Sequence, residues 1–177
     1  MQISSPKKIA INDVDLPDQF RQAMSEVALA VHILSTCGPA GEGAMTASSI
    51  CSVSLSPPTL LACVARASRM NAKLKENGRV CVNTLAVEHI DVAEACANLK
   101  GKSGNKELKS SKWLREDGFS CPFLSSAISS CEGRIHSVSE IATHTVFFIE
   151  VQIIRTGPVQ ADPLIWHRRG FSSATNR

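Results

Sequence analysis

Residues 43–58 read GAMTASSICSVSLSPP, and the interpretation of the whole chain depends on this stretch. It has the composition of a β-strand, but its early positions carry hydroxyl groups where a core strand carries apolar side chains. The hydroxyl residues of the segment are Thr46, Ser48, Ser49, Ser52, Ser54 and Ser56. Small neighbours such as Gly43, Ala44 and Ala47 allow a flat ligand to approach the backbone closely. The stretch therefore predicts one strand, ended by Pro57 and Pro58, that cradles a flat ligand.

A phosphate site is predicted shortly after this strand. Taken alone, serine and threonine also suit edge strands and turns, so the ligand hypothesis depends on the residues after Pro58. Residues 66–69 read RASR, and Ser68 is a suitable N-cap for a helix that ends at Gly78. A helix N-terminus offers free amide groups, and arginine forks match phosphate oxygens. We therefore predict that Arg66, Ser68 and Arg69 bind a phosphate, the alternative being an ordinary solvated turn.

Two histidines stand where strands begin or end. His144 heads the strand HTVFFIEV, where a rim histidine can bind a carboxamide or neutralise an anionic ring, although a surface histidine is the common alternative. His167 follows the apolar strand PLIW and precedes Arg168 and Arg169. Adjacent side chains on a strand point to opposite faces, so only one of these arginines can face a pocket. We favour Arg168, as a partner for a dinucleotide pyrophosphate.

Composition restricts the class of protein. The 177 residues fit one domain, and a net charge of +3 with 5% aromatic residues speaks against a nucleic-acid binder. The seven cysteines are an odd number without a CxxC pair, which removes support for a metal site or a disulfide framework. Cysteines inside apolar runs suit a reducing compartment, so we expect a cytoplasmic protein. We also expect neither a signal peptide nor a membrane span.

The pattern along the chain predicts a mainly β fold with short helices. Residues 1–15 are expected to form an arm before a single domain at 16–177, which begins with a helix capped by Asp15 or Asp18. The segment 28–36 should form a hairpin with the strand that begins at 43, and 162–171 should close the chain as one last strand. About six or seven strands imply a closed or partly closed antiparallel barrel with helical caps.

A lysine-rich segment interrupts this pattern at residues 100–118. It contains a single candidate for burial, Trp113, and we interpret it as a surface excursion. Its lysines are Lys100, Lys102, Lys106, Lys109 and Lys112. A solvated loop is the favoured interpretation, and a docking surface for a partner protein is the alternative.

Six ordered blocks of sequence resemble one known family. They are FRQAM, AVHILST leading into CGPAG, MTASSICSVSLSPPTLLACV, GRVCVNTLA, THTVFFIEV and PLIWHRRGF, and together they span residues 20–171. The chain is similar to the flavin reductase family, and within it to the small NAD(P)H:flavin oxidoreductase components of two-component monooxygenases. Examples of such monooxygenases are the 4-hydroxyphenylacetate, chlorophenol and pyrimidine-ring systems.

The resemblance implies a fold and an activity. The fold is an FMN-binding split β-barrel, a Greek-key antiparallel barrel, assembled as a homodimer. The activity is reduction of loosely held FMN or FAD by NADH or NADPH, with NADH preferred, through hydride transfer to flavin N5. The reduced flavin would pass to a partner monooxygenase in the degradation of aromatic compounds. The implied enzyme uses no metal, nucleic acid or membrane.

The resemblance also implies site residues. The residues along the flavin and its phosphate are Met45, Thr46, Ala47, Ser48, Ser49, Cys63, Val64, Ala65, Arg66, Ser68 and Arg69. His144, as the catalytic residue, and the pair His167 and Arg168 match the nicotinamide side. This chain departs from many relatives at His32 (asparagine), Ala142 (glycine) and Trp166 (tyrosine or phenylalanine), which points to a changed nicotinamide pocket.

Two other functions fit a similar barrel. One is a non-catalytic module that binds flavin or haem, and the other is an enzyme like pyridoxine phosphate oxidase, which holds FMN tightly. Hydrolase and nucleotide-triphosphatase functions lack support, since the chain has no G-x-S-x-G, H-E-x-x-H or P-loop motif. Turnover of NADH with excess flavin distinguishes a reductase from both alternatives.

Overall fold

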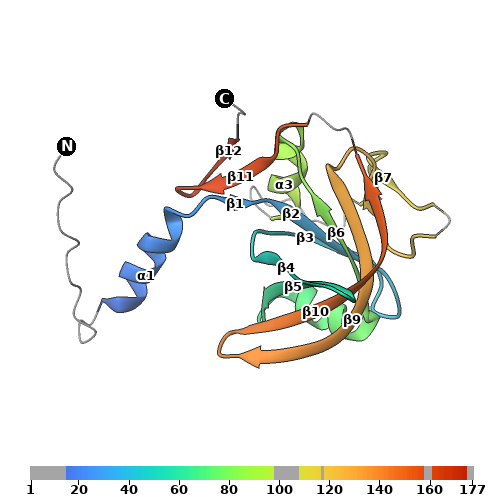
Figure 1. Ribbon diagram of the computed structural model, residues 1–177, viewed down its shortest axis with the longest axis horizontal. Helices are drawn as coiled ribbons and strands as arrows, with labels where there is room; N and C mark the ends of the chain where they lie inside the picture. The colour runs from blue at the N-terminus through green and yellow to red at the C-terminus, as the bar shows by residue number, and fades with distance from the viewer. Residues whose placement is uncertain (1–14, 98–107, 117, 158–160, 175–177) are drawn as a thin grey trace.

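The computed structural model describes residues 15–97, 108–116, 118–157 and 161–174 (Figure 1). Its body is a seven-stranded antiparallel sheet in the order β3-β2-β6-β9-β10-β5-β4. These strands are β2 (His32–Thr36), β3 (Gly43–Ala47), β4 (Ile50–Leu55), β5 (Pro58–Ala65), β6 (Arg79–Thr84), β9 (Ser129–Ile141) and β10 (His144–Thr156). The mainly β fold with short helices is confirmed, and the predicted arm lies almost wholly outside the described residues.

Two smaller sheets and short helices complete the described chain. One small sheet contains β1 (Leu29–Ala30), β11 (Leu164–His167) and β12 (Gly170–Ser173), and the other contains β7 (Trp113–Leu114) and β8 (Phe123–Leu124). The helices are α1 (Leu16–Ser25), α2 (Arg69–Asn77) and α3 (Ile90–Cys96), and the 3₁₀ turn η1 (Val87–His89) leads into α3. Within the described residues, no helix combines the length and apolar character needed to cross a membrane.

The stretch 43–58 is two strands rather than the single strand predicted. β3 and β4 stand at opposite ends of the seven-strand order, and the chain passes between them at Ser48 and Ser49. The backbone N–H of Cys63 on β5 donates to the Ser49 carbonyl over 3.0 Å, so the junction continues the pairing of β4 with β5, and only two residues separate the two edge strands. The sheet therefore curls into a barrel that stays open between β3 and β4, and the hydroxyl-rich segment spans the opening.

The core forms on both faces of β2. Leu34 packs into the barrel interior with Phe147 and Ile149, whereas Ile33, its neighbour in sequence, packs outward under α3. This alternation is the ordinary consequence of strand geometry. The outer cluster also buries Trp113, as predicted.

The lysine-rich excursion has a second buried anchor. Leu108 is 1% exposed in the outer cluster, so the prediction of a single buried residue was wrong. Lys112 is half-buried and pairs with Asp91 over 2.5 Å. Lys100, Lys102 and Lys106 lie outside the described residues.

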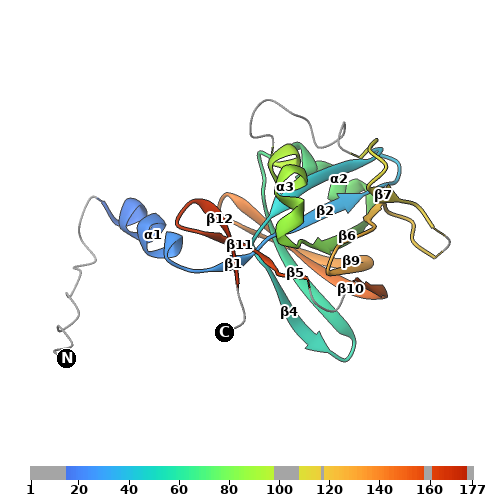
Figure 2. The same cartoon turned by 90° about the horizontal axis from the view of Figure 1, so that it is seen from above.

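Local sequence signals place the helix ends correctly. Ser68 is the N-cap of α2, where its hydroxyl accepts a bond from the Met70 amide, and Gly78 ends the helix with a φ of 65°. Asp15 occupies the N-cap position of α1 without a side-chain bond. None of the α1 residues is buried, and the helix stands apart from the body in both views (Figure 1, Figure 2).

The last segment is a hairpin rather than one strand. β11 and β12 pair antiparallel, with Trp166 opposite Phe171, and Arg168 and Arg169 form the turn. Both arginines have positive φ values, 49° and 62°, which a tight two-residue hairpin turn requires. The prediction that the two arginines alternate across a strand was therefore wrong.

Candidate functional site

A cavity of about 230 Å³ lies beside the opening of the barrel. Its walls come from the seven-stranded sheet, from the sheet of β1, β11 and β12, and from the end of α3. The lining residues are Val31, Thr46, Ala47, Ser48, Ala97, Trp166 and Phe171. Trp166 and Phe171 meet edge to face, with ring centroids 5.1 Å apart. The cavity therefore has an aromatic wall on the β11–β12 hairpin and small residues on the β3 side.

The predicted residues 45–48, in β3 and just after it, contact the cavity and the core, with Ala47 at both. Met45 packs against the barrel interior, while Thr46, Ala47 and Ser48 line the cavity. The Thr46 hydroxyl donates to the Ala93 carbonyl of α3 over 2.6 Å. This hydroxyl is already bonded within the protein, so a ligand role for Thr46 depends on its backbone.

β5 leads from the barrel opening to the predicted phosphate site. Val64 is 1% exposed and points into the barrel, so Cys63 and Ala65 lie on the other face of the strand. Burial, with a smaller contribution from the nearby Cys51, raises the pKa of the Cys63 thiol. Cys63 is consequently a neutral small side chain at pH 7, suited to a contact surface rather than to nucleophilic chemistry.

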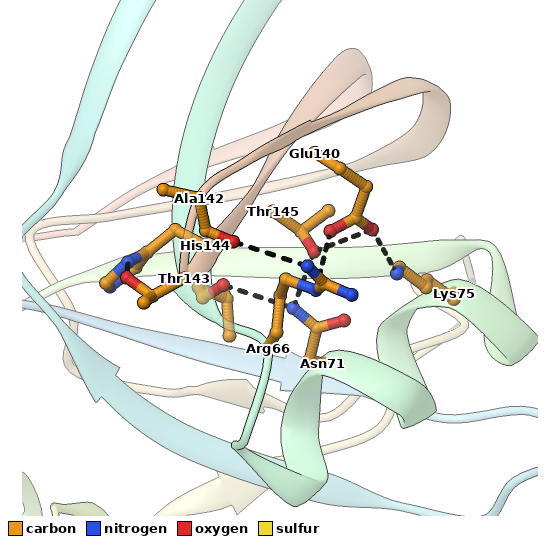
Figure 3. Close-up of polar contacts among 9 residues, drawn as sticks. Arg66, Asn71, Lys75, Glu140, Ala142, Thr143, His144 and Thr145 are labelled. Atoms are coloured by element: carbon orange, nitrogen blue, oxygen red, sulfur yellow. Dashed lines mark hydrogen bonds and ion pairs between the residues drawn. The ribbon is translucent and has the colours of Figure 1, made fainter.

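Arg66 begins a cluster of polar contacts that we call the Arg66 corner: Arg66, Asn71, Lys75, Glu140, Thr143, His144 and Thr145 (Figure 3). The Arg66 amide donates to the Thr143 carbonyl over 2.9 Å, and its guanidinium donates to the Ala142 carbonyl over 3.3 Å. Arg66 Nε also lies 3.1 Å from Glu140 Oε2, and Lys75 Nζ lies 2.5 Å from Glu140 Oε1. One carboxylate therefore serves two cations.

Asn71 connects this corner to the barrel. Its side-chain amide is buried and donates to the Val64 carbonyl over 3.1 Å and to Thr145 Oγ1 over 2.9 Å. Thr145 Oγ1 in turn donates to Glu140 Oε1 over 3.0 Å. The hydrogen bond from Lys75, supported by Thr145 and the charge of Arg66, lowers the pKa of Glu140. Glu140 is thus an ionised carboxylate held by Lys75 of α2, Arg66 of the turn before α2 and Thr145 of β10.

His144 lies in the same corner but on the opposite face of the sheet. It pairs with Ala65 in the β5–β10 register, while Thr145 pairs with Val64 on the other face. His144 Nδ1 shares a hydrogen bond of 2.9 Å with Thr143 Oγ1, and the ring is exposed. In Figure 3 the ring points away from the ion pair between Arg66 and Glu140. The predicted position of His144 at the start of a strand is confirmed.

The predicted pair His167 and Arg168 belongs to another part of the molecule. Arg168 donates from its amide to the Ser25 carbonyl over 2.8 Å, and its Nε lies 2.8 Å from Glu26 Oε2. These contacts fix the β11–β12 turn to the end of α1. Arg168 is therefore bound to α1, away from the residues of the Arg66 corner, while its neighbour Trp166 borders the cavity.

His32 is one of the predicted departures, and its environment keeps it neutral. Its Nδ1 lies 3.2 Å from Thr84 Oγ1, and burial lowers the pKa of the imidazole to about 4. A neutral imidazole exchanges hydrogen bonds with a hydroxyl much as an asparagine amide does. His32 is therefore accommodated at this position without a buried charge.

The cavity residues Val31, Ala97 and Phe171 were missed by the sequence reasoning. A hairpin assignment of residues 164–173 would have placed Phe171 opposite Trp166, because a two-residue turn at Arg168 and Arg169 fixes that register. Val31 and Ala97 carry no comparable signal, since the β1–β2 break and the end of α3 meet only in the folded chain.

The described residues offer no alternative site of metal or disulfide chemistry. Among them, no group of three or more histidine, cysteine, aspartate or glutamate side chains is arranged to hold a metal ion. The seven cysteines are all free thiols. Cys81 and Cys121 are buried, and burial raises the pKa of each thiol well above its ordinary value.

Comparison with known proteins gives a consistent result. The sequence model of the family described as "Flavin reductase like domain" matches residues 24–175. The chain is 40% identical over 152 residues to the 4-hydroxyphenylacetate 3-monooxygenase reductase component of Pseudomonas aeruginosa, covering 86% of this chain and 88% of that protein. It is also 40% identical over 161 residues to the FMN reductase (NADH) RutF of Enterobacter cloacae, covering 88% and 93% of the two chains.

A solved structure shares the fold. The flavin reductase component BorF of a bacterial two-component tryptophan halogenase superposes with a TM-score of 0.83 at 26% identity. The match covers 91% of this chain and 99% of BorF. The predicted split-barrel architecture is confirmed by this likeness, with the barrel open between β3 and β4.

Proposed function

The chain belongs to the flavin reductase family, and from this premise we propose that it is an NAD(P)H:flavin oxidoreductase that reduces free FMN or FAD. NADH is the proposed donor. When NADH and the flavin are both bound, the nicotinamide would supply a hydride to flavin N5. The protein would then contribute binding, orientation and electrostatics.

The observation that supports this proposal most directly is that the chain connects the cavity to the Arg66 corner without a break. The cavity ends at Ser48, Ser49 is bonded to Cys63, and β5 then leads to Arg66. A flat ring with a phosphorylated chain matches this succession of an aromatic cavity, a strand with small side chains and a cationic helix start. The residues present therefore fit a flavin.

Each part of the proposed site has a physical task. Trp166 and Phe171 provide apolar surface that excludes water from the reacting rings. The backbone of Thr46 to Ser49 and the small side chains of Cys63 and Ala65 lie along the flavin. Arg66, Ser68 and Arg69 bind its phosphate at the start of α2, where amides and guanidinium groups favour an anion.

His144 orients the nicotinamide in this proposal. It stands on the same face of β5 and β10 as Ala65 and Cys63, so it can reach a carboxamide above the flavin side of the sheet. His167 and Arg168 contribute from the hairpin that carries Trp166. Hydride transfer needs no general base, so the task of His144 is hydrogen bonding and orientation.

We further propose that the reduced flavin is delivered to a partner monooxygenase that acts on an aromatic compound. The name of the relative from Pseudomonas aeruginosa, a monooxygenase reductase component, supports this role. The small side chains along the β3 side of the cavity and on β5 also suit a ligand that must leave. A transient complex with the oxygenase follows from the same reasoning.

A homodimer is the proposed assembly, and α1 supports it. No residue of this helix is buried, although its apolar side chains recur on one face. The exposed ones are Leu16, Phe20, Met24 and, just beyond the helix, Val27. A ten-residue helix without packing is marginal in water, so a second copy that covers this face would stabilise it.

The family match also bears on the proposed organisation. It spans residues 24–175, which supports one domain at 16–177 after an arm at 1–15. The free thiols support a cytoplasmic location, where thiols remain reduced.

The test is steady-state turnover. Purified protein is mixed with NADH and many equivalents of FMN or FAD, and the nicotinamide absorbance is followed. We expect continuous NADH oxidation in proportion to enzyme. Tight flavin or haem binding without turnover would instead support the non-catalytic module, and consumption of pyridoxine phosphate would support the oxidase.

A further inference from the structure

Glu140 has no role in the proposed binding of flavin. Its carboxylate is nevertheless paired with Arg66, a residue on which that binding depends. Its two oxygens accept from Arg66 Nε at 3.1 Å and from Lys75 Nζ at 2.5 Å. Two cations thus share one anion in the Arg66 corner (Figure 3). A phosphate that binds Arg66 has to compete with this carboxylate for the same N–H groups.

The ion pair is open to solvent. The side chains of Arg66 and Glu140 are 58% and 41% exposed, whereas Glu132, the carboxylate partner of Arg79, is 0% exposed. Glu132 also accepts from the amides of Ser120 and Cys121, so that pair is part of the core structure. Exposed pairs contribute little to stability, so the pair at Glu140 can be exchanged for another anion at small cost.

The geometry also shows where Glu140 holds Arg66. In the register of β9 and β10, Glu140 pairs with Thr145, which is on the face opposite to His144 and Ala65. The bond to Glu140 therefore holds the guanidinium on the Thr145 face of the sheet, opposite to the face that carries His144. Figure 3 shows the same separation between the His144 ring and the ion pair.

Glu140 is also a permanent competitor at neutral pH. The hydrogen bond from Lys75 is the largest of the contacts that lower the pKa of its carboxyl group. It therefore keeps its charge at neutral pH, and it offsets one of the two positive charges with which it pairs, those of Arg66 and Lys75.

We propose that Glu140 is a specificity-determining residue that limits the affinity of the site for phosphorylated flavins by competing with their phosphate for Arg66. This inference rests on the proposed function. FMN and riboflavin share the ring and differ by the phosphate, so the consequence is a smaller preference for FMN over riboflavin than Arg66 would give without Glu140. A phosphate held weakly also favours release of the reduced flavin.

The test compares FMN with riboflavin in Glu140→Gln, which removes the charge and keeps the shape. Flavin dissociation constants are measured by fluorescence titration. We expect FMN affinity to rise about two- to fivefold, the effect of releasing Arg66 from one exposed ion pair, with riboflavin changed less than about twofold. An FMN affinity that stays the same or falls overturns the proposal, because Glu140 would then position Arg66.

Matched variants locate the effect. Glu26→Gln removes the carboxylate of the exposed pair with Arg168 and should leave both affinities unchanged. In an Arg66→Ala background, Glu140→Gln should change FMN affinity less than about twofold, because the guanidinium for which Glu140 and the phosphate compete is then absent. A full effect in that background overturns the proposal. Glu140→Ala provides a second variant, with the same expected direction.

Failure of the proposed function is recognised separately. NADH oxidation with riboflavin reports the reductase activity without any phosphate. Turnover with riboflavin, combined with no gain of FMN affinity in Glu140→Gln, removes only the inference about Glu140. Absence of turnover with every flavin removes the reductase function itself.

Discussion

Arg66 and Arg168 both lie beside a histidine-bearing strand end, but their surroundings differ. In the Arg66 corner, Arg66 and Lys75 share Glu140, so the group keeps an excess of positive charge next to a capped helix. In the β11–β12 hairpin, Arg168 has Glu26 as its carboxylate partner and an amide fixed to Ser25. The first arrangement can receive an anion at a helix start, and the second also fastens a hairpin to the end of α1.

The comparison shows that an arginine's partners, more than its sequence neighbours, decide its use. Both arginines looked like phosphate ligands in the sequence. Arg66 stands where β5 leads away from the barrel opening, and Arg168 stands in a turn with a positive φ of 49°. Equivalent substitutions in the Arg66 corner and in the β11–β12 hairpin test how far the functions of the two regions differ.

The largest difference is expected from removing each arginine. Arg66→Ala should weaken FMN binding by about 1 to 3 kcal/mol, roughly 5- to 150-fold, because a charged hydrogen bond to phosphate is lost. Arg168→Ala should change the same dissociation constant less than about twofold. Titration of both variants with FMN checks this. Equal losses in the two variants would contradict the contrast between the regions.

Next in size is the helix cap of the Arg66 corner. Ser68→Ala should destabilise the protein by about 1 kcal/mol, since the Ser68 hydroxyl accepts from the Met70 amide at the start of α2. Urea unfolding gives the free energy of unfolding. Ser25→Ala is the matched control, because the Ser25 hydroxyl bonds to the Gln22 carbonyl at the other end of a helix. A loss in the control equal to that in Ser68→Ala would show that the cap is not special.

The two histidines provide an effect of similar size. His144→Ala should raise the Michaelis constant for NADH about 2- to 12-fold, the value of one hydrogen bond, and leave the FMN dissociation constant unchanged. His167→Ala tests the hairpin in the same assay. If His144→Ala left NADH kinetics untouched while the protein stayed folded, the nicotinamide assignment would be wrong.

The smallest effect is expected in the hairpin turn. Arg169 has a φ of 62°, where glycine is free of the steric penalty that a Cβ atom brings. Arg169→Gly should stabilise the protein by up to about 1 kcal/mol in thermal or urea unfolding. Arg169→Ala removes the same side chain but keeps the Cβ atom, so it should bring no gain. Equal stabilisation by both would attribute the effect to charge instead of backbone strain.

Local signals made part of the fold predictable. The ends of α2 followed from Ser68 and Gly78, because a cap bond and a left-handed C-cap involve only neighbouring residues. The hairpin of β2 and β3 followed from an apolar run and a turn-forming segment. The turn at Arg168 and Arg169 was missed because it lacks the asparagine and glycine that usually mark such turns.

The sequence identified residues of the candidate site better than it identified the contacts between them. Thr46, Ala47 and Ser48 do line the cavity, and His144 does meet the segment that leads to Arg66. Glu140 lay in a strand pattern without any feature to distinguish it. Its importance arises from the pairing of β9 with β10 and the approach of α2, which bring Lys75 and Arg66 to one carboxylate.

The sequence by itself determined the family, the mainly β fold and the chemical types of the site residues, since these depend on local patterns and ordered blocks. Residues 43–58 show what the tertiary structure alone decided. Their hydroxyl groups indicated a ligand, but their division into two strands depends on the curl of a seven-stranded sheet that brings its edges together at Ser48 and Ser49. Long-range strand pairing sets that division, and no residue within the stretch encodes it.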